Sequence, residues 1–238
     1  MTQGGNPTTV TEWAELLLSE FEQTGGTTEH DLEILRHQVA DLNTEEASDG
    51  IEPKERKFEV VRSRQDLEQV AEAVAAADVV ALDLETTSIN HRNGEIVGVG
   101  LAISEQEFYV PVAHRFPETG EPVPDQLPLS VVVGVLDLTC LQLIAHNAKF
   151  ELHWLRTHAG VNCTFLWDTM LAARLLRSDK RARLKEVAMR VLDVADWSLP
   201  KTDMGELAVM PVDTVARYCC LDCRMTRRLY EEQIKCLA

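Results

Sequence analysis

Two acidic residues stand two positions apart at the end of a β-branched run. The run Val79–Leu84 predicts a strand buried on both faces, and Asp83 and Glu85 lie at its end. Residues two apart on a strand project to one face, so we expect these carboxylates to point together. Adjacent anions repel each other, and a divalent cation with oxygen ligands is the usual compensation. A strand end that turns into solvent gives the same pattern, so the pair alone leaves both interpretations open.

Two later segments carry polar pairs at a spacing of four. Asn147 and Glu151 share one face of a predicted helix, and Tyr218 and Asp222 share one face of another. Each pair by itself has an ordinary structural interpretation. Asn147 is a plausible helix N-cap beside a surface glutamate, and Tyr218 a half-buried phenol beside a surface aspartate. The order of the three pairs along one chain is more specific than any of them singly.

In that order the pairs resemble the three exonuclease motifs of the DEDD superfamily. The similarity is to its tyrosine branch, as found in the 3′→5′ proofreading domain of family A (polymerase I-like) DNA polymerases, and it covers about residues 58–238. The histidine branch has a histidine five residues before the last aspartate, where this chain has Arg217. Three phrases carry the resemblance: Leu82-Asp83-Leu84-Glu85-Thr86-Thr87, His146-Asn147-Ala148-Lys149-Phe150 and Trp167-Asp168-Thr169-Met170-Leu171-Ala172-Ala173-Arg174-Leu175-Leu176.

The resemblance implies a metal-dependent hydrolase that releases nucleoside 5′-monophosphates from DNA 3′ ends, proofreading for a DNA polymerase during replication. It implies two Mg²⁺ or Mn²⁺ ions, with Tyr218 orienting the attacking water. The implied metal ligands are Asp83, Glu85, Glu151 and Asp222. The implied contacts to the single-stranded DNA 3′ end are Thr86, Thr87 and Ile89, in the pocket of the terminal nucleotide, and Asn147 along the strand. The second motif of the family normally ends in Asp, so Glu151 keeps the charge and adds one methylene of reach.

A basic segment offers a second feature for nucleic acid. Residues 174–190 hold seven basic side chains against two acidic ones, on a chain with a net charge of −16. A positive stretch of this kind suits a single-strand track, and a solvated pair of helices is the equally plausible alternative. The candidates for strand contact are Arg174, Lys180, Arg181 and Arg183.

The surrounding elements form an α/β pattern in which strands come early and helices late. We expect a ribonuclease H-like mixed sheet flanked by helices, with an N-terminal helical appendage. The predicted strands are Phe58–Val61, Val79–Leu84, Ile96–Ile103, Phe108–Val112 and Leu141–Ala145, and the predicted helices are one opening at Ser63-x-x-Asp66 and those over 148–158, 168–177, 183–192 and 212–235. A proline-rich loop is expected over about residues 114–128.

The N-terminal 57 residues differ in composition from the rest. They hold 13 acidic and 4 basic side chains, and their apolar spacing predicts two short helices followed by a polar linker. The expected division is therefore an acidic helical segment over 1–57 and an exonuclease domain over 58–238. The N-terminal helices either pack as a hairpin or dock on a partner, for which a DNA polymerase or another replication protein is the candidate.

The amino-acid composition limits which other classes of protein and partner are expected. The apolar stretches are far shorter than the ~20 residues a bilayer demands, so no membrane partner is expected. Six cysteines fit a reducing, cytoplasmic setting, and the Cys220-x-x-Cys223 pair is interpreted as buried thiols rather than a redox or zinc pair. Two other functions stay open: an exoribonuclease like ribonuclease D, and a non-catalytic replication interaction module, which Glu151 and the acidic N-terminal segment keep plausible.

Overall fold

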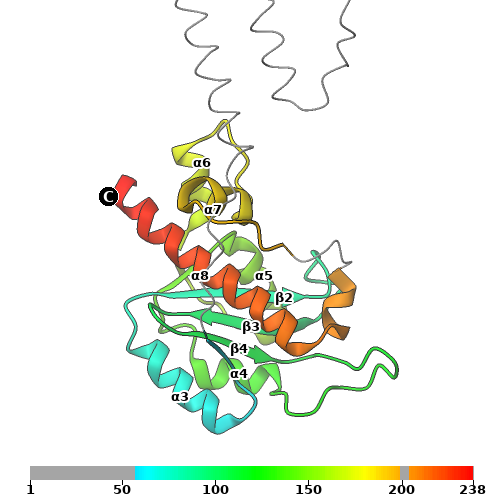
Figure 1. Ribbon diagram of the computed structural model, residues 1–238. Coiled ribbons are helices and arrows are strands. Elements are labelled where there is room, and N and C mark those ends of the chain that lie inside the picture. Colours follow the sequence, from blue (N-terminus) through cyan, green and yellow to red (C-terminus); the bar gives the residue numbers. More distant parts are fainter. Residues whose placement is uncertain (1–56, 199–203, 238) are drawn as a thin grey trace, which may run out of the picture. The chain divides into compact units, whose positions relative to one another are not determined.

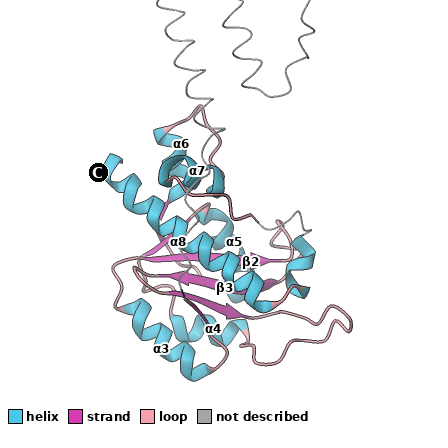
Figure 2. Cartoon of the chain, in the orientation of Figure 1, coloured by secondary structure: helices cyan, strands magenta, loops and turns pink. Residues whose placement is uncertain are grey.

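The described part of the molecule is a six-stranded mixed sheet with helices on both faces (Figures 1 and 2). The computed structural model describes residues 57–198 and 204–237, so the two predicted N-terminal helices lie outside the described residues. The strand order is β1-β4-β3-β2-β5-β6, with β3 antiparallel to both of its neighbours and the other pairs parallel. The strands are β1 (Phe58–Val60), β2 (Val80–Thr86), β3 (Ile96–Ala102), β4 (Glu107–Pro111), β5 (Leu143–Ala145) and β6 (Phe165–Asp168).

The helices divide between the two faces of this sheet. Helices α3 and α4 pack on each other beneath one face, and the long α8 crosses the opposite face (Figure 1). The helices are α3 (Arg64–Ala75), α4 (Leu129–Leu136), α5 (Ala148–Ala159), α6 (Thr169–Leu176), α7 (Leu184–Leu192) and α8 (Val212–Leu237), with a short 3₁₀ helix, η1 (Met204–Val209), before α8. None of the described helices combines the length and apolar character needed to cross a membrane.

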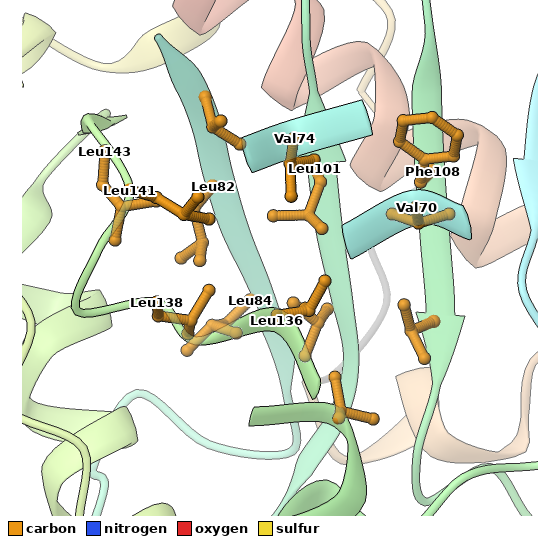
Figure 3. Close-up of a cluster of buried hydrophobic side chains, with 14 of the residues drawn as sticks. Val70, Val74, Leu82, Leu84, Leu101, Phe108, Leu136, Leu138, Leu141 and Leu143 are labelled. Atoms are coloured by element: carbon orange, nitrogen blue, oxygen red, sulfur yellow. The ribbon is translucent and has the colours of Figure 1, made fainter. Parts of the chain in front are cut away.

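Strand alternation assigns the side chains of β2 to the two faces. Leu82 and Leu84 belong to the largest core cluster, which includes Val70 and Val74 of α3 and Leu136 of α4 (Figure 3). The intervening positions of β2 point the other way, toward α8. The pair of acidic residues therefore lies on the α8 face, while the leucines between them anchor the strand in the core.

Two glycines of β3 let the α8 face pack closely. Gly100 lies opposite Asp83 and Gly98 lies opposite Glu85 in the antiparallel register. A Cβ atom at Gly100 would lie 2.4 Å from the Cys219 sulfur, and one at Gly98 would lie 2.0 Å from the Tyr109 hydroxyl. The lack of a side chain at Gly100 is what allows α8 to approach β2 beside Asp83, whereas the lack of one at Gly98 makes room for the Tyr109 ring of β4.

The predicted fold class is confirmed, with additions at two places. Ser63 caps α3 as its spacing indicated, because its hydroxyl accepts a hydrogen bond from the Asp66 amide. Helix α4 and strand β6 were not predicted. The Val131–Val133 run in α4 is β-branched and disfavours a helix locally, but Val132 is fully buried against the core. Tertiary packing therefore overrides local propensity in this segment.

Candidate active site

The centre of the site is the acidic pair on β2. One carboxylate oxygen of Asp83, one of Glu85 and the sulfur of Cys219 all lie within 4.8 Å of one another. Glu85 is only 5 % exposed, and its Oε1 atom has no hydrogen-bond partner. Burial, together with the charge of Asp222, raises the pKa of Asp83 to about 7. Burial and the neighbouring Asp83 charge raise the pKa of Glu85 as well.

Helix α8 brings Asp222 and Tyr218 to the same place. The charge of Asp222 raises the pKa of both Asp83 and Glu85, which lie 139 and 137 positions before it in the sequence. Asp222 is buried beneath α7, and it lies outside the compact group that Asp83 and Glu85 form with the sulfur. Strand β2 and helix α8 thus meet in the structure as predicted. The Asp222 carboxylate accepts its hydrogen bonds from residues outside this pair of elements.

Glu151 approaches from α5 and completes the acidic cluster. It is 2 % exposed, and its Oε2 atom is buried without a hydrogen-bond partner. Burial raises its pKa, and the charges of Asp83 and Glu85 raise it further. Buried carboxylate oxygens without donors are rare in folded proteins and call for an ion or another group. Two such oxygens, on Glu85 and Glu151, fit a site built for divalent cations.

Asp222 is held by a lysine that the motif argument did not assign to the site. The Lys185 ammonium, on α7, donates to both Asp222 carboxylate oxygens at 2.8 Å. The Trp197 indole N–H donates to Asp222 Oδ1 at 2.5 Å. Lys185 belongs to the basic segment, but its side chain points inward at the carboxylates. Neither residue was predicted here, because they are 37 and 25 positions from Asp222 and no motif connects them to it.

The Tyr218 phenol is a hydrogen-bond acceptor in this arrangement. Lys185 Nζ donates to its oxygen at 2.9 Å and lies 4.3 Å from the centre of its ring. Burial and the nearby Asp222 charge raise the pKa of Tyr218 above its ordinary value. The side chain therefore stays a neutral phenol, with its own proton directed away from the lysine.

Asp168 fixes the start of the helix that carries Glu151. Its Oδ1 atom accepts from the backbone amides of Asn147, Met170 and Leu171, and its Oδ2 atom accepts from Ala148. One carboxylate thus caps both α5 and α6. Asn147 occupies the N-cap position of α5 in a left-handed conformation at φ 78°. Its side chain makes no capping hydrogen bond, so the suggested side-chain cap is wrong.

His146 links the same junction to α7. Its Nε2 atom donates to the Ala182 carbonyl oxygen at 2.9 Å, and its Nδ1 atom lies 2.8 Å from the Thr169 hydroxyl oxygen. The imidazole is thereby fixed between β5, α6 and the segment leading into α7. This contact anchors the chain just before the helix that positions Lys185.

The residues implied in DNA contact occupy two regions. Thr86 and Thr87 hold the turn after β2, because the Thr86 hydroxyl donates to the Ser88 carbonyl and the Thr87 hydroxyl accepts from the Glu95 amide. Ile89 is exposed at the tip of that turn. Arg174 is exposed on α6, and the remaining basic candidates, Lys180, Arg181 and Arg183, line the segment between α6 and α7. Of the latter, Arg181 forms an ion pair with Glu186 at 3.7 Å.

Comparison with known proteins identifies the class. A family model of the DNA polymerase A type, described as 3′-5′ exonuclease, matches residues 58–235, and the chain belongs to this family. It contains a 3′-5′ exonuclease domain, and members of the family use divalent metal ions. Its exonuclease character, predicted from the motifs, is confirmed.

Curated relatives are DNA polymerases. DNA polymerase I of Chloroflexus aurantiacus is 31 % identical over 188 residues, which cover 72 % of this chain and 19 % of the relative. DNA polymerase I of a Synechocystis strain is 28 % identical over 191 residues, covering 73 % of this chain and 18 % of the relative. The chain therefore matches about a fifth of the length of these proteins.

Solved structures show the same fold at lower identity. The catalytic core of RRP6 from Trypanosoma brucei superposes with a TM-score of 0.59 at 16 % identity, covering 78 % of this chain and 48 % of that one. Escherichia coli RNase D gives 0.55 at 15 % identity, covering 75 % and 44 %. Brucella melitensis NrnC with bound Mg²⁺ gives 0.52 at 20 % identity, covering 68 % and 74 %. The ribonuclease H-like exonuclease fold predicted from the motifs is confirmed by these neighbours.

Proposed function

We propose that the chain hydrolyses DNA from its 3′ end, one nucleotide at a time, and proofreads for a DNA polymerase. The observation that carries this proposal is the convergence of Asp83, Glu85, Glu151 and Asp222 from β2, α5 and α8 on one buried site. DNA is favoured over RNA because the curated relatives are DNA polymerases, whereas the likeness to ribonucleases is one of fold.

The four carboxylates would hold two divalent ions, for which Mg²⁺ and Mn²⁺ are the candidates. When bound, such ions supply Lewis-acid stabilisation to the charge that develops on the attacking and leaving oxygens. The two partnerless oxygens, on Glu85 and Glu151, are the coordination groups most clearly unused within the protein. Glu151 therefore has a free oxygen to offer even though the family motif normally ends in Asp.

Tyr218 would contact the attacking water or the substrate, and Lys185 would orient the Tyr218 hydroxyl. Tyr218 stays protonated, so it cannot serve as the base. Because its oxygen accepts from Lys185, its own O–H is available to donate to the attacking water or to a phosphate oxygen. Water then attacks the phosphorus, the bond to the 3′ oxygen breaks, and a nucleoside 5′-monophosphate leaves behind a strand with a new 3′ hydroxyl.

Matched oligonucleotides test the substrate class. The purified chain in Mg²⁺ should shorten a 5′-labelled DNA strand stepwise from its 3′ end, faster than an RNA strand of the same sequence. Asp222→Asn should slow this by roughly a hundredfold or more. Asp179→Asn is the matched control, since Asp179 lies on the surface in an ion pair with Arg177. Faster cleavage of RNA would favour the ribonuclease D-like function, and cleavage of neither would favour a non-catalytic module.

The proofreading role has its own test. A mismatched 3′ terminus frays more readily than a paired one, so a proofreading site that takes single-stranded ends should remove it faster. Hydrolysis of two duplexes that differ only in the last base pair measures this ratio. Equal rates of hydrolysis on mismatched and paired 3′ ends would contradict the proofreading role and indicate a general 3′-end nuclease.

A further inference from the structure

The turn between β2 and β3, residues 87–95, carries the exposed side chain of Ile89. The motif resemblance implies that this side chain lies in the pocket of the terminal nucleotide. Ile89 is 78 % exposed, so packing does little to hold it, and its place is set by the backbone of the turn. The contacts that hold the β2–β3 turn therefore decide where Ile89 would meet a DNA end.

Hydrogen bonds inside the β2–β3 turn fix its shape. At its base the Thr87 amide donates to the Glu95 carbonyl at 3.1 Å, and the Glu95 amide donates to the Thr87 hydroxyl at 2.9 Å. In its middle the Asn93 amide donates to the Asn90 carbonyl at 2.9 Å. The direction in which the turn points, relative to the rest of the protein, depends on contacts outside it.

Helix α5 supplies such contacts, and three of its residues hold His91 of the turn. His158 Nε2 donates to the His91 backbone carbonyl oxygen at 2.7 Å. His91 Nδ1 lies 2.8 Å from the Thr157 hydroxyl oxygen. The His91 ring stacks on the His153 ring, with centres 5.1 Å apart and planes 11° from parallel. His153 and Thr157 are four residues apart and share one face of α5, along which the His91 ring lies.

The buried core sets the direction of the His158 ring. It stacks on the Trp154 ring, with centres 4.8 Å apart and planes 17° from parallel. Trp154 is fully buried, and close packing leaves such a ring little freedom to turn. Trp154 also bounds the turn itself, because a Cβ atom at Gly94 would lie 2.9 Å from the edge of its ring. The core thus aims the His158 N–H at the turn.

The same helix carries Glu151, one of the implied metal ligands. Seven residues separate Glu151 from His158, which corresponds to about 10 Å along a helix. A helix is stiff over this length, so α5 keeps the β2–β3 turn at a constant distance from the carboxylate cluster. The contacts to His91 therefore connect the place of the DNA end with the place of the reaction.

We propose that Thr157 and His158 are positioning residues of the nuclease, which hold the β2–β3 turn against α5 and so place Ile89 for the terminal nucleotide. This inference rests on the proposed function, because contact of the chain with a DNA 3′ end is part of it. The hydrogen bonds of both residues go to the turn. Their loss should therefore weaken binding of the strand end more than it slows the chemical step.

Substitution of His158 tests this role by steady-state kinetics. His158→Phe keeps a ring against Trp154 and removes the donor to His91. The KM for a single-stranded DNA 3′ end should rise roughly threefold to tenfold, with kcat changed by less than about twofold. His158→Gln keeps an N–H donor at a similar reach and should recover most of the wild-type KM.

A pair of threonines gives a second variant and its matched control. Thr157→Val keeps the shape of the side chain, removes the hydroxyl that contacts His91, and should also raise KM. It decides the question if circular dichroism shows that His158→Phe does not fold. Thr139→Val is the matched control, because the exposed Thr139 hydroxyl donates to Asp137 in the segment before β5. Its KM should equal that of the wild type.

Amide hydrogen exchange tests the contact with α5 without any activity. In the metal-free full chain, residues 87–95 should exchange roughly threefold to tenfold faster in His158→Phe and Thr157→Val than in the wild type and Thr139→Val. Unchanged KM in both variants of a chain that hydrolyses DNA would overturn the proposal and leave the proposed function standing. No hydrolysis by the wild-type chain would overturn the proposed function and the positioning role with it, whatever the exchange rates.

Discussion

The ammonium of Lys185 lies 2.8 Å from both carboxylate oxygens of Asp222 and 2.9 Å from the phenol oxygen of Tyr218. One lysine from α7 thus holds the two α8 residues that the motif argument placed together. It brings a positive charge into a site that otherwise gathers four carboxylates. Lys185 is therefore a positively charged partner for Asp222 that the protein itself supplies.

Lys185→Met should destabilise the metal-free protein. Removing the ammonium leaves the buried Asp222 charge with the Trp197 indole as its hydrogen-bond donor, and breaking a buried ion pair in this way costs about 3–5 kcal/mol. Mg²⁺ can replace the lost positive charge, so we expect it to raise the melting temperature of Lys185→Met more than that of the wild type. Thermal unfolding in chelator and in Mg²⁺ measures both effects.

Arg183→Met is the matched control for Lys185. Arg183 is exposed at the N-cap of α7 and makes no side-chain capping bond, so its replacement should change stability by less than about 0.5 kcal/mol. If Lys185→Met and the wild type have the same melting temperature in chelator, the lysine is not a structural partner of Asp222.

The raised pKa of Asp83 predicts an unusual pH dependence of stability. The folded protein keeps the Asp83 proton up to about pH 7, whereas the unfolded chain loses it near pH 4. Between these values the folded state binds more protons, so this group makes the free energy of unfolding fall as pH rises. Divalent ions compete with the same proton and should bind more tightly as pH rises through this window.

Asp83→Asn removes that contribution, and it also lowers the raised pKa values of Glu85 and Glu151, which changes the pH dependence of stability in the same direction. Burial lowers the pKa of His114 to about 4, which acts on stability in the opposite direction, but it is present in both proteins. Denaturant unfolding in chelator between about pH 4 and about pH 8 should therefore show the variant gaining on the wild type as pH rises. Parallel curves would mean that Asp83 titrates normally in the folded state.

Gly100→Ala should disturb the approach of α8 to β2. The added Cβ would lie 2.4 Å from the Cys219 sulfur and 2.9 Å from the Cys223 sulfur, and both thiols are fully buried. Overpacking of this kind costs about 1–3 kcal/mol, and displacement of α8 should reduce exonuclease activity as well. Denaturant unfolding and hydrolysis of a DNA strand measure the two effects.

Gly134→Ala is the matched control with the opposite sign. Its Cβ would meet nothing within 4 Å, and the residue lies inside α4. Alanine is favoured over glycine in a helix by about 0.5–1 kcal/mol, so this variant should be more stable than the wild type. If Gly100→Ala were as stable and as active as Gly134→Ala, the packing around Cys219 would have room for the added methyl group.

Asp168→Ala should loosen two helices at once. The carboxylate accepts four backbone amides from α5 and α6, and loss of a helix cap costs about 1 kcal/mol for each helix. Because α5 carries Glu151, activity should fall beyond what the lost stability explains. Asp168→Asn replaces one acceptor oxygen by a donor and should lie between the two proteins. Equal activity of all three at a temperature where each is folded would contradict a positioning role.

The fold was predictable where periodicity and packing agree. Helix α8 was expected over 212–235 and spans Val212–Leu237, because its apolar positions repeat at helical spacing along the whole face that meets the sheet. Helix α4 was missed because β-branched residues fill its middle, and its stability comes from burial against α3 and α5. Such burial depends on the rest of the chain and leaves little local signal.

The candidate site was predictable only as far as motifs reach. Strand and helix periodicity indicated that the carboxylates share faces, and the structure gathers them at one place. The partners Lys185 and Trp197 come from other segments, and nothing local marks them. Within the basic segment, charge counting predicted a nucleic-acid track, but only packing shows that Lys185 faces inward.

Crystals of the full chain soaked in Mn²⁺ provide the most direct test of the central claim, since the anomalous signal of manganese locates each ion. We predict two peaks, each about 2 Å from an oxygen of the carboxylate cluster, with Asp83 contacting at least one of them, and their loss in Asp83→Asn crystals. Soaked wild-type crystals with clear density for all four carboxylates and no manganese among them would contradict the account.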